Sequence, residues 1–228
     1  MNKGIFFIDL HTHQPAKVGV VSLQNISLAD IHNYPNEKGQ FFSVGLHPWQ
    51  VNSNEDLGLL NQQLRFAAGY QHVKAIGETG IDKSIELPLE YQEAVFKVHI
   101  RVSEEFQLPL VVHCVRAFQE ILVLRKSMAA SQPWIFHGFA GSAQLARQCL
   151  NAGCLLSFGP SLLNDHSRSA HSMISLGIDD FFLETDDSGI DVEVLYRRAA
   201  HIKHIGVEVI SERILNRFNK IFCQQKYL

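Results

Sequence analysis

Short apolar runs that end at a polar or ionisable residue recur along the whole chain. Most of these runs are rich in Val, Ile, Leu or Phe, and each has the length of a single buried parallel β-strand. Eight such runs are found, at Ile5–Ile8, Val18–Leu23, Phe41–Leu46, Val73–Gly77, Leu108–Val112, Trp134–Phe136, Cys154–Phe158 and Phe181–Leu183. The pattern predicts a parallel sheet, which in turn needs helices to connect its strands.

Helical periodicity lies between several of these runs. Apolar residues recur every three or four positions from Tyr91 to Phe106, and Pro88 suits a first helical turn. Ser142 is a candidate cap for another helix, and further apolar stripes cover residues 195–202 and 210–221. Strands that alternate with helices indicate βα units, so eight of them predict an α/β fold of the TIM type, a (βα)8 barrel.

The first unit departs from this pattern. Only a few residues separate His13 from Val18, whereas a parallel crossover needs about a dozen or more. We therefore expect a first crossover helix that is missing or displaced, or a Val18–Leu23 run that pairs in some other way. The length of 228 residues agrees with a lean barrel, since the fold needs roughly 200 or more. Because the composition is even from end to end, residues 1–228 are expected to form a single domain.

Charge and cysteine usage limit the class of protein. The net charge of −3 argues against a basic domain held to nucleic acid by bulk charge, but not against an enzyme that grips a few phosphates. No apolar run approaches the roughly 18 residues of a membrane span, and the run before Asp9 is too short for a signal peptide. The four cysteines form no CxxC pair. We expect a cytoplasmic protein with reduced thiols, no membrane association and a monomeric or weakly oligomeric state.

Ionisable residues gather at the ends of the predicted strands. The carboxyl ends of barrel strands meet at one face, where they carry the chemistry. Here those ends hold Asp9, His11, His13, His47, Glu78, His113, His137 and Asp186. Imidazole and carboxylate groups suit Zn, Mn or similar divalent ions, and residues two apart in a strand point to the same side. The sequence therefore predicts a metal site to which the His11–His13 pair contributes.

Each of these residues also has a simpler explanation when it is taken alone. His113 fits a core histidine, Glu78 a helix cap and Asp186 an ordinary loop carboxylate. Only their joint place at the strand ends favours a metal site. The remaining histidines lie on predicted helices or loops and are expected to be surface or packing residues. Among them, His201 and His204 have a spacing that also suits a metal.

Six motifs, spread over nearly the whole chain, carry a resemblance to a known family. In chain order they are Asp9-Leu10-His11-Thr12-His13, Gly45-Leu46-His47-Pro48, Ala75–Asp82, Leu110–His113, His137–Ser142 and Leu183–Asp186. Together they resemble the TatD family of metal-dependent hydrolases, which belongs to the amidohydrolase-like metal barrels. The Ala75–Asp82 block is the most specific of the six.

The resemblance implies a site for two divalent ions of Zn, Mn or Mg. One ion would be held by His11, His13, Glu78 and Asp186, and the other by Glu78, His113 and His137, with Glu78 as the bridge. The implied reaction is hydrolysis of phosphodiester bonds, DNase- or exonuclease-like, by a metal-activated water.

The chemistry of these residue types suggests roles in catalysis and substrate binding. Asp186 is the candidate for orienting the water and taking its proton, and Glu78 is the second catalytic residue. His47 and Arg116 are candidates for contacting the substrate, since an arginine can hold a phosphate by two hydrogen bonds. For a nucleic-acid substrate, a basic rim is the further feature to seek, with candidates Arg116, Arg168, Arg197 and Arg198.

Four features depart from the family pattern. Trp49 stands where another histidine usually follows G-x-H-P, and Arg116 lies one position later than usual. The loop after Asp186 is short, and the first crossover is truncated. All four affect the expected substrate walls rather than the metal ligands. Two alternatives therefore stay open: a metal-dependent hydrolase of a small-molecule amide, lactone or phosphoester, and a non-catalytic metal-binding interaction barrel.

Overall fold

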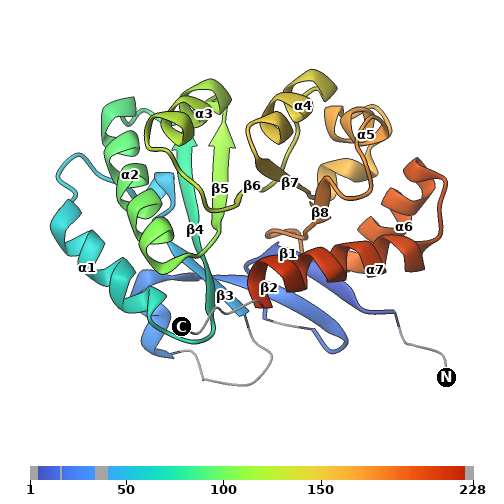
Figure 1. The fold of residues 1–228 in the computed structure, drawn as a ribbon, viewed down its shortest axis with the longest axis horizontal. Helices are drawn as coiled ribbons and strands as arrows, with labels where there is room; N and C mark the ends of the chain where they lie inside the picture. The colour runs from blue at the N-terminus through green and yellow to red at the C-terminus, as the bar shows by residue number, and fades with distance from the viewer. Residues whose placement is uncertain (1–4, 16, 34–40, 224–228) are drawn as a thin grey trace. The chain divides into compact units, whose positions relative to one another are not determined.

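The eight runs predicted as strands all form strands in the computed structural model, which describes residues 5–15, 17–33 and 41–223 (Figure 1). The strands are β1 Phe7–Thr12, β2 Val20–Ser27, β3 Phe41–Gly45, β4 Val73–Asp82, β5 Leu110–Val115, β6 Trp134–Phe136, β7 Cys154–Phe158 and β8 Phe181–Leu183. They form one sheet in the order β1 to β8. The pairs β1–β2, β3–β4, β4–β5, β5–β6 and β7–β8 are parallel.

A parallel bridge between Thr12 and Asp186 links the end of β1 to the segment after β8. Sequential parallel strands whose last member returns to the first are the topology of a TIM-type (βα)8 barrel, as the sequence predicts. Among the described residues, none of the helices combines the length and the apolar composition that crossing a bilayer requires.

The connection between β1 and β2 contains no helix in its described residues, 13–15 and 17–19. β2 nevertheless pairs parallel with β1, with Phe7 opposite Val20. The expectation of a missing first helix is confirmed. A cleft of about 320 Å³ lies along this stretch, with Phe7 and Val20 in its lining.

The first of two compact units consists of the residues up to Gln24 and those from His137 onward. Its helices are α4 Ala143–Asn151, α5 Arg168–Ile174, α6 Val192–Lys203 and α7 Val207–Phe218, with single turns at Pro160–Leu163 and Asn219–Cys223. Helices α6 and α7 pack against each other and against β1. The Tyr196 hydroxyl on α6 accepts the Ile8 N–H and donates to the Ile8 carbonyl, both at 3.0 Å, which holds α6 on the strand.

The second unit covers Asn25–Phe136. Its helices are α1 Leu57–Ala68, α2 Leu89–Phe106 and α3 Phe118–Ser127, with single 3-10 segments η1 Leu28–Asn33 and η2 Pro48–Gln50. Helix α2 packs along β4 and against α1 (Figure 1). Every residue of β4 is buried. At Gly80 a Cβ atom would lie 2.0 Å from the His113 carbonyl oxygen, so only glycine permits this approach of β4 to β5.

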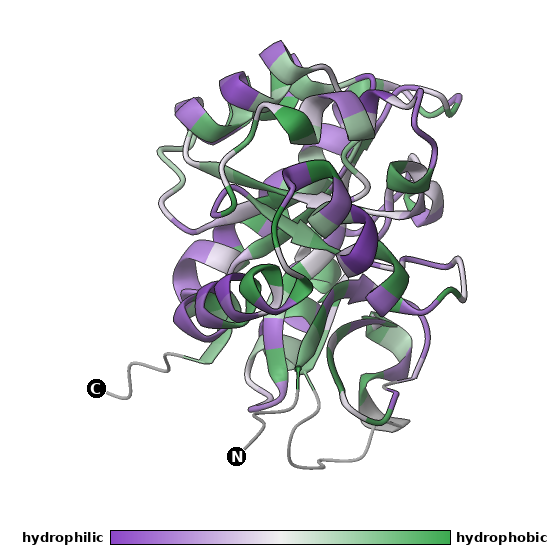
Figure 2. Cartoon of the chain, turned by 90° about the vertical axis from the view of Figure 1, so that its right-hand side faces the viewer, coloured by the Kyte–Doolittle hydropathy of each residue, from purple (hydrophilic) through white to green (hydrophobic). Residues whose placement is uncertain are grey.

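Four helices match the predicted apolar stripes, and three have no prediction. The matches are α2, α4, α6 and α7, with the Ser142 hydroxyl capping α4 by accepting the Leu145 N–H. Of the three helices without a prediction, α3 buries Ile121 and Leu124, whereas α1 and α5 bury four residues each. Hydrophilic and hydrophobic bands alternate along the helix ribbons, as expected for helices that bury one face (Figure 2).

Candidate metal centre

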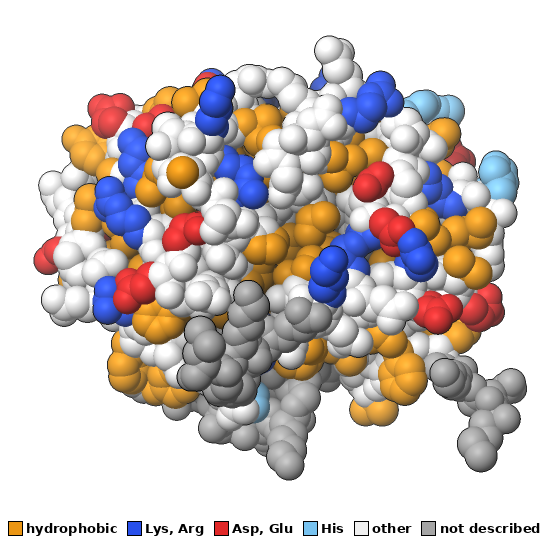
Figure 3. Space-filling view, in the orientation of Figure 1, with side chains coloured by type: hydrophobic (Ala, Val, Ile, Leu, Met, Phe, Trp, Pro, Cys, Tyr) orange, Lys and Arg blue, Asp and Glu red, His pale blue; other side chains and the backbone are white. Residues whose placement is uncertain are grey.

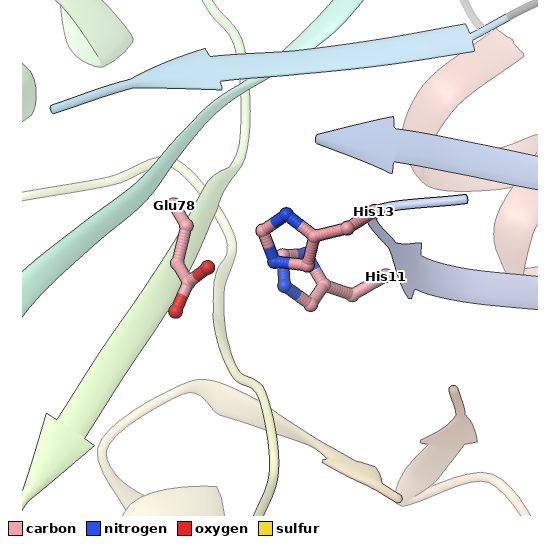
Figure 4. Close-up of side chains that lie close together, drawn as sticks. All are labelled: His11, His13 and Glu78. Atoms are coloured by element: carbon pink, nitrogen blue, oxygen red, sulfur yellow. The ribbon is translucent and has the colours of Figure 1, made fainter. Parts of the chain in front are cut away.

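His11 and His13 project to the same side at the end of β1, with their rings beside each other (Figure 4). The ring centroids lie 5.1 Å apart. The Nε2 atoms of His11 and His13 lie 3.6 Å and 3.5 Å from the same carboxylate oxygen, Oδ1 of Asp186. Asp186 reaches this position because its backbone N–H donates to the His11 carbonyl and its carbonyl accepts the His13 N–H. One carboxylate therefore faces both imidazoles of the predicted pair.

His137 joins this first cluster from the end of β6. His11, His137 and Asp186 each offer one ligand atom, and the three atoms lie within 4.8 Å of one another. Nδ1 of His137 lies 3.4 Å from Oε1 of Glu184, and that oxygen also accepts the Gly138 N–H at 2.6 Å. Burial raises the pKa of the Glu184 carboxyl, but the hydrogen bond and charge of His137 outweigh it and the pKa is lowered. An ionised Glu184 beside Nδ1 of His137 would favour a proton on that atom, which would leave Nε2 available for a metal.

The Asp9 carboxylate hydrogen-bonds to Thr185 and is not part of this cluster. Its carboxylate oxygens accept the Thr185 N–H at 2.9 Å and the Thr185 hydroxyl at 2.6 Å. Burial raises the pKa of the Asp9 carboxyl to about 6. Asp9 thereby ties β1 to the segment that carries Asp186.

A second cluster lies within the other unit. Glu78 extends from β4 (Figure 4), and His47, Glu78 and His113 offer ligand atoms that lie within 4.8 Å of one another. Oε1 of Glu78 is 2.8 Å from Nδ1 of His113 and 3.2 Å from Nε2 of His47. The Asn25 amide oxygen accepts the Glu78 backbone N–H at 2.9 Å. A carboxylate as buried as Glu78 needs positive partners, and a divalent ion would be one.

Asp82 backs His113 at the ring nitrogen that does not face Glu78. Its Oδ2 lies 3.2 Å from Nε2 of His113 and accepts the Trp49 indole N–H at 2.8 Å. Although burial raises the pKa of Asp82, hydrogen bonds from Ser84 and Trp49 outweigh it and lower the pKa to about 2. With a metal bound beside Glu78, the ionised Asp82 would hold the proton on Nε2 of His113, and Nδ1, which lies 2.8 Å from Oε1 of Glu78, would offer its lone pair to the ion. Carboxylate-backed histidines of this kind are typical of metal sites.

The family model for TatD related DNase matches residues 9–222. The chain belongs to this family. Among its relatives, "Uncharacterized metal-dependent hydrolase YabD" of Bacillus subtilis is 28% identical over 151 residues, which cover 64% of this chain and 58% of the relative. The "3'-5' ssDNA/RNA exonuclease TatD" of Salmonella typhimurium is 32% identical over 119 residues, 49% of this chain and 43% of the relative. The chain thus spans less than two thirds of the length of these two relatives.

A solved TatD homologue, YjjV from Escherichia coli, shares the fold of this family member. The two structures superpose with a TM-score of 0.82 at 20% identity, and the match covers 96% of this chain and 98% of the other. The TatD resemblance and the barrel prediction are confirmed.

Within this TatD chain, His47, the predicted substrate contact, lies beside Glu78 and His113 in the second cluster. The Trp49 backbone N–H donates to Nδ1 of His47 at 3.1 Å, so the proton of the neutral ring is on Nε2. That N–H can donate to Glu78, or to a bound substrate, but a metal ligand would need a lone pair there. His47 is therefore better suited to hydrogen bonding than to holding an ion.

The candidates for a basic rim differ in their surroundings. Arg116 is exposed directly after β5 and has a φ of 55°. Arg197 pairs with Glu193, and Arg198 pairs with Asp165 and donates to the Leu162 carbonyl. These two arginines are therefore already neutralised by acidic neighbours. His201 and His204 at the end of α6 have ring centroids 6.5 Å apart, and among the described residues they belong to no candidate metal group.

Three supporting residues were not predicted as part of the site. Asp82 and Glu184 stand inside the family motifs, and Asp82 shares the strand side of Glu78 by its spacing of four, so the sequence contained a signal for both. Asn25 had no such signal, because it reaches Glu78 only through the pairing of strands. The backing carboxylates were therefore marked by the motifs that contain them, whereas the residue that braces the Glu78 backbone was not marked by its own sequence neighbourhood.

Proposed function

We propose that this TatD family member is a hydrolase that requires divalent metal ions and cleaves phosphodiester bonds, with DNase- or exonuclease-like activity. The observation that carries the proposal is the pair of histidine–carboxylate clusters, each with one histidine backed by a further carboxylate. Such a donor set fits Zn or Mn, and the backing carboxylates orient the ring nitrogens for coordination. Family membership supplies the reaction class.

We assign the ligands as the family resemblance implies. His11, His13, Glu78 and Asp186 would hold one ion, and Glu78, His113 and His137 the other, with Glu78 shared. This assignment is supported by the general convergence of strand ends in a parallel barrel. Bound divalent ions would supply Lewis acidity and a hydroxide nucleophile near neutral pH.

Side chains of this protein would accept the proton and hold the substrate. Asp186 is the proposed proton acceptor, because its side chain is 40% exposed and so within reach of water. His47 would donate its Nε2–H to a substrate oxygen. Arg116, exposed at the end of β5, would pair with a phosphate by its guanidinium.

A small-molecule substrate is the second candidate. The observation that favours it is the state of the basic residues, since Arg197 and Arg198 are held in ion pairs. On the face shown in Figure 3, Lys and Arg side chains are interspersed with Asp and Glu rather than gathered. A substrate with few phosphates would suit such a surface better than a long polyanion.

The test is hydrolysis by the full chain after chelation and reloading with Zn, Mn or Mg. The substrates are end-labelled single-stranded DNA and a panel of small phosphodiesters, amides and lactones. Metal-dependent cleavage of DNA would support the nuclease, and cleavage confined to a small substrate would support the second candidate. Stoichiometric metal binding without turnover on any substrate would favour a non-catalytic barrel and refute the hydrolase.

We also propose that residues 1–228 act as one hydrolase domain in the cytoplasm. The family match across residues 9–222 supports a single functional unit. All four cysteines are thiols, and a reducing compartment keeps them so.

A further inference from the structure

Trp49 is a large aromatic side chain left on the surface beside the second cluster. Its side chain is 69% exposed, whereas the other tryptophan, Trp134, is fully buried. Tryptophan is highly buried on average in folded proteins, so this exposure is unusual for its type. It belongs to the single turn η2 Pro48–Gln50, immediately after His47.

The exposed indole is nevertheless held in place. Its Nε1–H donates to Oδ2 of Asp82 at 2.8 Å, and its backbone N–H donates to Nδ1 of His47 at 3.1 Å. The ring meets His47 edge-on at a centroid distance of 5.2 Å and lies 6.5 Å from His113. An indole fixed along its polar edge, with its surface open to solvent, is preorganised to receive a flat partner.

The chemistry of the indole selects that partner. Its one polar group is occupied by Asp82, so the exposed part of the ring offers a π-face and apolar area but no hydrogen bond. Nucleobases stack on such faces with a contribution of about 1–3 kcal/mol per base. An unpaired base can do this, whereas a base in a duplex is already stacked on its neighbours.

Charge makes this contribution more important here than in a basic nuclease. The chain has a net charge of −3, and several of its basic side chains are paired with acidic ones, including Lys83 with Glu120 and Arg65 with Glu105. Phosphate contacts alone would therefore give weak binding. A stacking residue next to the cluster would both strengthen binding and position the strand.

We propose that Trp49 forms a base-binding subsite, on which an unpaired nucleobase next to the scissile phosphodiester stacks. The inference rests on the proposed function and extends it, because it makes the enzyme prefer base-bearing single strands over abasic phosphodiester chains. Trp49 determines specificity in this scheme and takes no part in bond cleavage.

The first test is intrinsic fluorescence of the full-length, chelated protein, in which no cleavage occurs. Trp49 is the exposed one of the two tryptophans, so a stacked base should quench its emission while the buried Trp134 keeps its own. A short oligodeoxythymidylate should quench and give a saturable binding curve. An abasic oligomer of equal length should not. Equal quenching by both oligomers would overturn the proposal, since binding would then depend on the phosphates alone.

The second test compares two variants that both lose the indole N–H. Trp49→Phe keeps an aromatic face, and Trp49→Leu does not. Trp49→Leu should lower the affinity for the base-bearing oligomer about 5- to 150-fold, which corresponds to the stacking energy, while Trp49→Phe should keep most of it. Phe66→Leu is the matched control, because Phe66 is also exposed, at 53%, but lies on α1.

The variants separate stacking from an anchoring role. Equal losses in the Phe and Leu variants would show that Trp49 acts only by holding Asp82, and would overturn the subsite. Base-dependent quenching in a protein that cleaves no phosphodiester would sustain the subsite and refute the proposed hydrolysis. Equal cleavage of base-bearing and abasic strands would sustain the proposed hydrolysis and refute the subsite.

Discussion

Asp82→Asn is the substitution that most directly tests how the second cluster prepares its ligand. In the native side chain, Oδ1 accepts the N–H of Ser84 at 2.8 Å and its hydroxyl at 2.5 Å, while Oδ2 accepts from Trp49 and faces His113. An asparagine amide has one oxygen and one NH₂, so it can accept from only one of these pairs. The groups on the other side then face the hydrogens of the amide NH₂ and lose their acceptor.

Either orientation of the asparagine amide weakens the support of His113 or removes a hydrogen bond. If the NH₂ faces His113, Nε2 of His113 must accept, which moves the ring proton to Nδ1 and blocks the atom that faces Glu78. If the oxygen faces His113, the Ser84 N–H is left without its acceptor, and the negative charge that raises the basicity of the ring is gone. Losing such a backing carboxylate typically lowers metal affinity about 10- to 100-fold. That is about 1.4 to 2.7 kcal/mol at 1.36 kcal/mol per tenfold change.

The assay has two readouts. Metal affinity is measured by competition with a chromogenic chelator, and the His113 tautomer by ¹⁵N NMR of the imidazole nitrogens. Asp56→Asn is the matched control, because Asp56 caps α1 through its side chain and asparagine caps as well as aspartate. Native metal affinity within about twofold, together with a proton still on Nε2 of His113, would refute the reasoning, since the expected loss is at least about tenfold.

Three further outcomes are expected. Replacing both His11 and His13 by alanine should lower the metal content measured by elemental analysis. The control variant, with His201 and His204 replaced by alanine, should keep its metal. Equal metal content in all three proteins would contradict the ligand assignment. Asp186→Asn should lower kcat by about 10² to 10⁴ with at least one ion retained, and a rate within about twofold of the native one would remove Asp186 as the base. Burial lowers the pKa of His99 from 6.5 to about 4, so the contribution of its neutral ring to stability is fully present above pH 6.5 and should fall by about 3 kcal/mol as the pH drops towards 4. His99→Gln should flatten that fall in denaturant titrations, and an unchanged pH profile would show that another group causes it.

The strands could be predicted because the residues that define each strand are neighbours in the sequence. A buried parallel strand is apolar along its whole length, and the polar residue that ends each run is visible in the sequence itself. The same holds for α2, whose apolar stripe from Tyr91 to Phe106 corresponds to its observed span of Leu89–Phe106. Helix α3 buries only two residues, and two of the four buried residues of α5 are serines, so neither helix shows a clear apolar stripe. Helix α1 does bury residues at helical spacing, from Leu60 to Ala68, and the prediction missed it.

The sequence by itself determined the strand ends, the ligand types and the family, because each depends on residues close together in the chain. Only the tertiary structure decided which groups face the ring nitrogens of His47, His113 and His137. Asp82, 31 residues away, contacts Nε2 of His113, and the Trp49 N–H donates to Nδ1 of His47. Hydrogen-bond partners of this kind are set by the register between strands and by the path of loops. A sequence pattern specifies that an imidazole is present, whereas its tautomer depends on the atoms that packing brings within about 3 Å.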